Sequence, residues 1–305
     1  AAAGNSAEVP VAGAAVTTVI KSGSNTPRGE VYADYKPGGH KYTPGGRRLF
    51  DGAENYARYR DINGQLGGPF MKDRLWYFIS FRDQYTALTT AMFDRPPEEG
   101  GIPGQPFTTQ TTEYTIKLHH QLNGESALTF MTQLGRKYQP HRGGSGPSAF
   151  QYPVESTARQ DSRSNIGKAG YMRVIGNRAT LDASLNVYGN HFPLTAHTDK
   201  TPIIPDVSFV RRGAYNMPGL SKDRRRHYNA DLTIYADRHD IKIGYMYQRY
   251  APQFTAYGAP GPAGTTGHFY IVTTNGTPSS FWTDNGPVST VNILKNHALF
   301  FQDKF

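Results

Sequence analysis

The stretch TTEYTIKLHHQL, residues 111–122, alternates between two kinds of side chain. Tyr114 and Ile116 belong to one set, whereas Glu113 and Lys117 belong to the other. Successive side chains of a β-strand point to opposite faces of a sheet, so this period of two predicts a strand with one apolar and one polar face. Every formal charge in the stretch falls on the polar face.

Residues 180–188, 228–235 and 240–248 repeat this alternation, again with the charges confined to one face. We expect these strands to be about 9–11 residues long, the length of a tilted transmembrane strand, rather than the 5–6 residues usual in globular proteins. A charge on a lipid-facing position near the middle of a membrane costs about 2–4 kcal/mol, which explains why one face excludes charge. The pattern therefore predicts a transmembrane antiparallel β-barrel.

The lengths of the connections support the same architecture. Short connections, at 67–74, 123–125, 175–179 and 236–239, alternate with long ones, as expected when short periplasmic turns lie on one rim of a barrel and long extracellular loops on the other. A further hairpin is expected near residues 268–283. The ten predicted strands lie near residues 28–36, 56–66, 75–84, 111–122, 126–134, 164–174, 180–189, 227–235, 240–250 and 296–305.

Composition agrees with strands that are apolar on one face only. The 305 residues are 37% hydrophobic but 12% aromatic, with 33 Gly and 21 Pro, and no run approaches the roughly 20 apolar residues of a transmembrane helix. The absence of cysteine excludes a disulfide scaffold and thiolate metal sites. An open sheet of ten strands would leave two unpaired edges in lipid, so either ten strands close into a small barrel or the chain is part of a longer one.

The segment NGQLGGPFMKDRLWYFISFRD, residues 63–83, predicts a turn followed by an aromatic strand. Tyr77 is expected on one side of this strand and Phe78 and Arg82 on the lumen side, so the aromatic run would serve membrane anchorage and lumen packing. Glycine and proline supply the backbone angles of a tight turn. The turn is assigned to Gly67, Gly68, Pro69, Lys72 and Asp73.

Basic residues account for the net charge of +9 and cluster in the predicted long loops. They are expected either to contact anionic headgroups of the outer leaflet and solvent, or to form a funnel for an anionic ligand such as a siderophore or an acidic glycan. No recognition helix or RNA-binding motif points to nucleic acid. The candidate residues are Arg47, Arg48, Arg136, Lys137, Arg142, Arg211, Arg212, Arg224, Arg225 and Arg226.

Motifs for catalysis, metal binding or cofactor binding are not found. His119 and His120 are adjacent, so on a strand they point to opposite faces, and no other histidines have ligand spacing. A nucleophile elbow of the form G-x-S-x-G is absent. We therefore expect neither an enzyme nor a resident cofactor.

Four segments together resemble one family. AVTTVIKSGSNTPRGEVYADY, residues 15–35, resembles the junction between plug and barrel in TonB-dependent outer-membrane receptors. Residues 63–83, quoted above, resemble a signature hairpin of the Oar-like subgroup. HDIKIGYMYQRY, residues 239–250, and ALFFQDKF, residues 298–305, resemble two further strands of that subgroup, and all four follow the order of the family.

This resemblance implies a 22-stranded barrel in the bacterial outer membrane, with an N-terminal plug and uptake of a large or scarce ligand energised by the TonB complex of the inner membrane. Residues 1–25 would form the end of the plug and the junction, and residues 26–305 the first part of the barrel. A TonB box is not found, so the chain is expected to be an internal fragment. Outer-membrane lipid, lipopolysaccharide, TonB and an unknown ligand or surface protein are the implied partners.

The polar faces of the strands would contact the plug or water. The residues expected to do so are Glu113, Lys117, Asp182, Asp231 and Lys242. An alternative function is that of a non-transporting barrel that serves as an adhesion or scaffold subunit of a surface complex. A self-closed ten-stranded enzyme is disfavoured because no catalytic set can be assembled.

Overall fold

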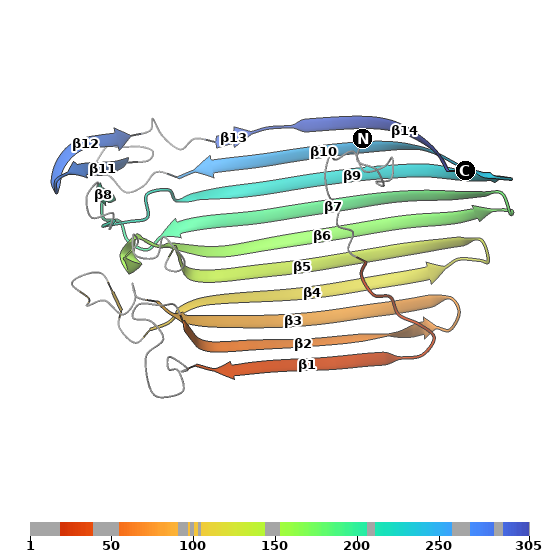
Figure 1. Ribbon diagram of the computed structural model, residues 1–305, viewed down its shortest axis with the longest axis horizontal. Helices are drawn as coiled ribbons and strands as arrows, with labels where there is room; N and C mark the ends of the chain where they lie inside the picture. The colour runs from red at the N-terminus through yellow and green to blue at the C-terminus, as the bar shows by residue number, and fades with distance from the viewer. Residues whose placement is uncertain are drawn as a thin grey trace.

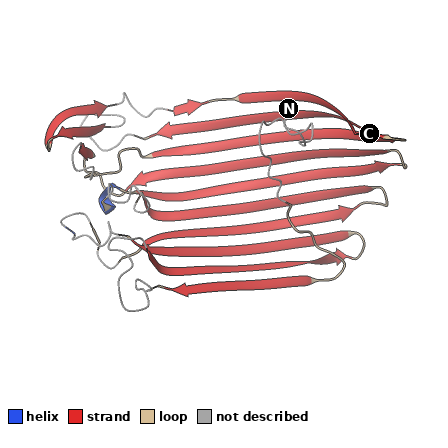
Figure 2. Ribbon diagram, viewed as in Figure 1, coloured by secondary structure: helices blue, strands red, loops and turns tan. Residues whose placement is uncertain are grey.

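The computed structural model of the chain describes residues 19–38, 55–90, 97, 101–102, 105–143, 153–205, 211–257, 269–283 and 289–304. These residues form an all-β structure in which one broad sheet dominates (Figures 1 and 2). Within the described residues, no helix is both long and apolar enough to cross a membrane. The prediction of an all-β, antiparallel architecture is confirmed.

The broad sheet has eleven strands, and every pair of neighbours is antiparallel. Strands that follow one another along the chain lie side by side, apart from short elements near the loops. Its members are β1 (Arg28–Pro37), β2 (Asn55–Met71), β3 (Leu75–Thr89), β4 (Phe107–Gln121), β5 (Ser126–Arg142), β6 (Ala158–Ile175), β7 (Ala179–Ala196), β9 (Gly219–Ala236), β10 (His239–Ala256), β13 (Ser289–Val291) and β14 (Leu294–Lys304).

All ten predicted strands are present, but most are longer than the sequence indicated. The strands from β2 to β10 in this sheet contain 15 to 18 residues, against the predicted 9–11. Eighteen residues span roughly 45 Å at a tilt of about 40°, compared with an apolar band of about 25 Å. Backbone pairing therefore continues beyond the part of each strand where side chains alternate between apolar and polar.

The register gives the sheet two distinct faces. Ile79, Ile116 and Thr132 are directly opposite one another on neighbouring strands, and so are Lys117, Met131 and Lys168. We call the face that carries Ile116 the apolar face and the face that carries Lys117 the polar face. The predicted alternation in residues 111–122, 180–188, 228–235 and 240–248 is confirmed by this register.

Exposure on the two faces is the reverse of that in a water-soluble protein. On the apolar face, Ile116, Phe130 and Leu134 are 48%, 49% and 51% exposed. On the polar face, Thr115 and Asp231 are 6% and 5% exposed. Water-soluble sheets bury their apolar face, so this arrangement fits an apolar solvent outside and a polar interior.

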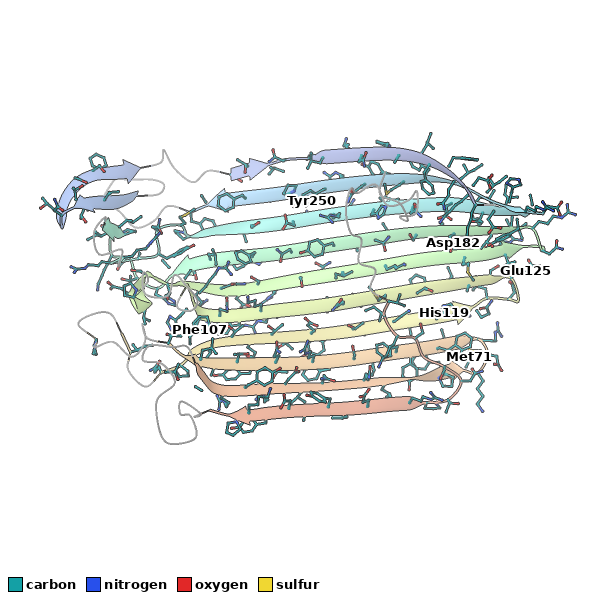
Figure 3. All side chains as sticks on the ribbon, viewed as in Figure 1. Met71, Phe107, His119, Glu125, Asp182 and Tyr250 are labelled. Carbon is teal, nitrogen blue, oxygen red and sulfur yellow. The ribbon has the colours of Figure 1, made fainter. Side chains whose placement is uncertain are left out.

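The short connections gather at one rim of the sheet (Figure 1). Asp73, Gly176 and Asp237 each have a positive φ, of 60°, 57° and 55°, so each turn reverses the chain through one left-handed residue. In the remaining short turn, the side chain of Asn123 accepts hydrogen bonds from the backbone N–H groups of Glu125 and Ser126. Figure 3 shows Met71 and Glu125 at this rim and Phe107 at the opposite end.

The assignment of the first turn to Gly67, Gly68 and Pro69 is wrong. These residues belong to β2 and pair with Phe78, Tyr77 and Trp76, whereas the chain turns at Lys72, Asp73 and Arg74. The two glycines instead permit close approach of the N-terminal segment. A Cβ on Gly67 would lie 3.3 Å from the Cα of Gly23, and a Cβ on Gly68 would lie 3.3 Å from the Cα of Pro27.

The opposite end of the sheet carries a small packed cap. Phe107 is 3% exposed and packs against Leu88, Ile102 and Val154, the last of which begins the 3-10 helix Val154–Ser156. A second sheet beside it contains β8 (Ile203–Pro205), β11 (Phe269–Thr274) and β12 (Thr277–Thr283). The hairpin of β11 and β12 confirms the one predicted near residues 268–283.

Candidate functional site

The segment before β1 lies against the polar face of the sheet, close to the short turns. The backbone carbonyl of Ile20 accepts a hydrogen bond from Lys117 Nζ at 2.9 Å. Because Lys117 belongs to the polar face of β4, this contact fixes the side of the sheet on which the segment lies. In Figure 1 the segment appears in red, crossing the sheet before β1 begins.

Asn25 anchors this segment to the turn between β2 and β3. Its Oδ1 accepts hydrogen bonds from the backbone N–H of Asp73 at 2.9 Å and from Trp76 Nε1 at 2.8 Å. Its Nδ2 donates to Asp73 Oδ1 at 2.5 Å. One amide side chain thus satisfies three polar groups that lie far away in the sequence.

The aromatic run in β3 divides between the two faces. Phe78 is 7% exposed on the polar face, as expected, and Arg82 on the same face pairs with Asp61, the Nη2 to Oδ2 distance being 2.6 Å. Trp76 stacks on His119 with ring centroids 5.6 Å apart, in addition to its bond to Asn25. Trp76, on the polar face, therefore holds the N-terminal segment, whereas Tyr77 lies on the apolar face.

Four of the five predicted polar-face residues gather around one hollow of about 490 Å³. Lys117, Asp182, Asp231 and Lys242 all line it, and the Nζ of Lys242 lies 3.4 Å from Oδ2 of Asp231. Glu113 is on the same face but lies nearer the loop end of β4, directly opposite Arg82. We call this hollow the polar hollow. Because positively and negatively charged side chains both line it, it favours contact with water or with a polar surface, such as that of a folded segment.

The predicted basic residues do not form one group. Arg136, Lys137 and Arg142 lie in β5, and Arg224, Arg225 and Arg226 lie in β9, so their assignment to loops is wrong. Pairing with the neighbouring strands continues through these residues, which is why they are strand residues despite their polarity. Arg47 and Arg48 lie outside the described residues.

Alternation separates these strand residues into two sets. Arg136, Arg224 and Arg226 lie on the apolar face. Lys137 and Arg225 lie on the polar face, where the guanidinium of Arg225 is 4.9 Å from the ring centroid of Tyr250.

The remaining basic candidates have local partners. Arg142 donates a hydrogen bond to Gln160 Oε1 at 2.7 Å. Near the small sheet, Arg211 donates to Asn216 Oδ1 at 2.5 Å, and the backbone of Arg212 pairs with that of Ile203. These contacts do not favour a single anion funnel built from the whole set.

The sequence reasoning missed Arg163 on the apolar face and placed Lys222, which lies on the same face of β9, in a loop. Arg163 is directly opposite Arg136, and Lys222 is directly opposite His191. If the alternation of side chains is extended from the apolar part of each strand toward its loop end, both residues fall on this face. Their significance depends on neighbours that only the register reveals.

The loop end holds a second cluster of titratable groups, outside the strand segments that carry the apolar rows. Glu155 accepts hydrogen bonds from Lys200 Nζ at 2.9 Å and from the backbone N–H of Gly213 at 3.0 Å. Burial opposes ionisation of Glu155, but these hydrogen bonds outweigh it and lower the pKa of the carboxyl. The ion pair therefore ties the 3-10 helix to the segment after β7.

The rings of His141 and His197 lie 4.7 Å apart in the same region. The Nδ1 of His141 is 3.1 Å from Thr157 Oγ1, and the Nε2 of His197 is 2.7 Å from the carbonyl oxygen of Pro140. Burial, with the nearby His197 ring as a second cause, lowers the pKa of His141 to about 4. His141 is consequently uncharged at neutral pH.

Among the described residues, no group of three His, Asp or Glu side chains could hold a metal ion. His119 and His120 lie on opposite faces, as predicted, because His119 is opposite Trp76 and His120 is opposite Leu75. The arrangement is that of a two-faced sheet with a docked segment.

The sequence is similar to that of a known transporter. Over 144 residues, which are 39% of this chain, it is 28% identical to the TonB-dependent transporter Oar of Myxococcus xanthus, and the matched part is 13% of that protein. No family model matches the chain.

Among solved structures, the chain matches part of the ferric-catecholate import receptor Fiu from E. coli K12, in its open form. The TM-score is 0.46 at 12% sequence identity, and the match covers 91% of this chain and 47% of Fiu. The chain thus spans less than two thirds of either protein.

Proposed function

We propose that this chain, which is similar over 144 residues to the TonB-dependent transporter Oar, forms part of the barrel of an outer-membrane receptor that takes up a large or scarce ligand. The observation that carries this proposal is the position of the N-terminal segment. It docks on the polar face of a sheet whose opposite face exposes apolar side chains. In a receptor, the polar face is the lumen and the docked segment is the end of a plug.

The proposed membrane location follows from the energetics of the two faces. In water, the exposed apolar face would be unfavourable over its whole area, whereas lipid removes that penalty. In the described part of the chain, β1 and β14 each pair along one side only, which is tolerable in a membrane only if further pairing closes the barrel. The family architecture of 22 strands provides that closure.

The polar hollow is the proposed contact surface between barrel and plug. Lys117, Asp231 and Lys242 present charges of both signs toward the lumen. Lys242 lies 3.4 Å from Asp231, and Lys117 donates a hydrogen bond to the backbone carbonyl of Ile20 in the docked segment. A polar contact of this kind suits a plug that must move when TonB pulls on it.

The membrane location can be tested with single cysteines, because the chain has none of its own. Ile116→Cys on the apolar face and Glu113→Cys on the polar face form a matched pair on one strand. In the full-length protein reconstituted in vesicles, a fluorophore at position 116 should be quenched by brominated lipid, and a fluorophore at position 113 by aqueous iodide. Equal quenching of both positions by iodide alone would exclude the membrane location.

Energised transport requires a separate test, since a scaffold barrel would pass the first one. Lys21→Cys places a reporter on the docked segment, next to Ile20. In cells that express the full-length protein without other cysteines, its labelling by a membrane-impermeant maleimide should depend on TonB and on the proton gradient. Labelling that is identical with and without TonB would favour the scaffold alternative.

A further inference from the structure

The apolar face carries a group of basic side chains directly above its apolar rows, on the side away from the short turns. Arg136, Arg163, His191 and Lys222 form one row across β5, β6, β7 and β9. Arg224 lies in the next row toward the short turns, two residues after Lys222 on β9. We call these five residues the outer basic patch; Figure 1 shows their four strands side by side.

The patch surrounds an open depression of about 610 Å³. Gly189 contributes to its floor, in the row that also holds Leu134, Asn165 and Arg224. A Cβ on Gly189 would lie 2.4 Å from Asn165 Oδ1, so a side chain there would intrude on the depression. The depression is large enough for a phosphate group with part of the sugar that bears it.

Charge on the patch is poorly balanced. Arg136 is directly opposite Arg163, and like charges at directly opposite positions destabilise a sheet. Asp161 accepts two hydrogen bonds from Arg136, from Nε at 2.7 Å and from Nη2 at 2.9 Å. The carboxylate of Asp223, next in sequence to Lys222 and Arg224, belongs to the polar face, where it accepts a hydrogen bond at 3.0 Å from Tyr250. An anion in the depression would relieve the remaining repulsion.

The height of the patch identifies the class of anion. Immediately below it, Leu134, Ile116 and Phe130 expose apolar side chains, so the patch lies at the boundary between lipid tails and headgroups. The boundary continues along the sheet, because Arg226 is directly opposite Arg249 and Arg249 is opposite Lys295. The band of basic residues thus steps four residues toward the short turns within β9, from Lys222 to Arg226, and continues at that level across β10 and β14.

We propose that the outer basic patch binds the phosphate groups of a phosphorylated glycolipid, such as the lipid A part of lipopolysaccharide, in the leaflet on the loop side. This inference depends on the proposed membrane location. Guanidinium groups bind phosphate through paired, charge-assisted hydrogen bonds, and Arg163 and Arg224 are both exposed and line the depression. Acyl chains would then pack on the apolar rows below.

The test compares two adjacent arginines of β9 that face opposite sides. The full-length protein, purified in detergent and stripped of lipid, is titrated with lipid A and with dephosphorylated lipid A, and complexes are counted by native mass spectrometry. The double variant Arg163→Gln with Arg224→Gln should weaken binding of lipid A by about 10- to 100-fold, given two charge-assisted hydrogen-bonding groups. Arg225→Gln, on the polar face, should leave it within about twofold.

Dephosphorylated lipid A should bind the unaltered protein as weakly as lipid A binds the double variant. Equal binding of the two lipids, or an equal loss in Arg225→Gln, would overturn the proposal. Inorganic phosphate is the third arm, and competition by phosphate at concentrations similar to those of lipid A would indicate a soluble anion instead of a lipid. If the cysteine pair shows the membrane location and lipid A fails to bind, only this inference is lost.

Discussion

At the scale of single residues, Asn25 and the loop-end histidines carry the most specific interactions. Asn25 holds the N-terminal segment to the β2–β3 turn through Asp73 and Trp76, whereas Ile20 is held through its backbone carbonyl. Hydrogen bonds of this kind contribute about 0.5–1.5 kcal/mol each, and leaving their partners unsatisfied adds to the loss.

Replacing Asn25 by Ala should release the segment from the sheet. We expect faster cleavage by trypsin after Lys21 and a red shift in Trp76 fluorescence, because the indole N–H loses its partner and gains water. Ser24→Ala is the matched control, since the Ser24 hydroxyl donates to the nearby carbonyl of Thr26 and not to the sheet. Unchanged cleavage in Asn25→Ala would show that backbone contacts suffice.

The loop-end cap should weaken as the pH falls from about 6.5 to about 4. The pKa of His141 is lowered from 6.5 to about 4 in the folded protein, so between these values the unfolded state binds a proton that the folded state does not. Stability of the cap then decreases with falling pH by on the order of 1–2 kcal/mol, allowing for partial exposure, with little further loss from this group below pH 4. Hydrogen exchange of the amides around Thr157, recorded at about pH 7.5 and about pH 5 and corrected for intrinsic rates, measures the effect.

In His141→Gln, the residue no longer titrates, so that part of the pH dependence should disappear. His141→Gln that retains the full pH dependence would assign it to another group, such as His197. The pKa of His197 is also lowered, chiefly by burial, although the carbonyl of Pro140 opposes the shift.

At the scale of elements, the turns and the strands follow different rules. The strands form because alternation matches two different surroundings, whereas three of the short turns each depend on one residue that tolerates a positive φ. Gly176 shows this most simply, because no atom would lie within 4 Å of a Cβ added to it. Its requirement for glycine is therefore purely conformational.

Gly176→Ala should reduce the free energy of unfolding by about 1 kcal/mol, because alanine resists a φ of +57°. Gly124 lies in another short turn and also has open space around it, without a positive φ. Gly124→Ala should therefore be neutral or slightly stabilising. Urea unfolding of the two variants in detergent micelles compares them, and equal midpoints would contradict the conformational explanation.

At the scale of the whole molecule, the sheet has two unlike faces. Its apolar face exposes large apolar side chains, and its polar face receives the N-terminal segment. Because adjacent residues of a strand lie on opposite faces, the same substitution should have a different energetic cost at two adjacent positions. The difference is absent from a sheet that is surrounded by water on both faces.

Leu185→Lys and Asn186→Lys test this division at neighbouring positions of β7. The first places a charge on the apolar face and should cost about 2–4 kcal/mol in a lipid bilayer, whereas the second places it on the polar face and should cost less than about 1 kcal/mol. The folded fraction in lipid vesicles, measured by resistance to urea, gives the comparison. Similar costs for the two lysines would indicate that both faces contact water.

The sequence by itself determined where strands occur, their two faces and three of the four short turns, because alternation and turn residues are local properties. It failed at Gly67 and Gly68, which looked like turn glycines but serve a contact with a segment distant in sequence. It also failed for the basic residues of β5 and β9, which appeared to belong to loops because their polarity hides the strand pattern.

Only the tertiary structure decided which charges are neighbours. Whether Arg136 meets Arg163, and whether Arg224 and Arg225 face different media, depends on strand register, and a shift of one residue would reverse every face. Register results from pairing between whole strands. The physical reason for the limit is therefore that alternation fixes the two faces of each strand, whereas cross-strand pairing fixes what those faces meet.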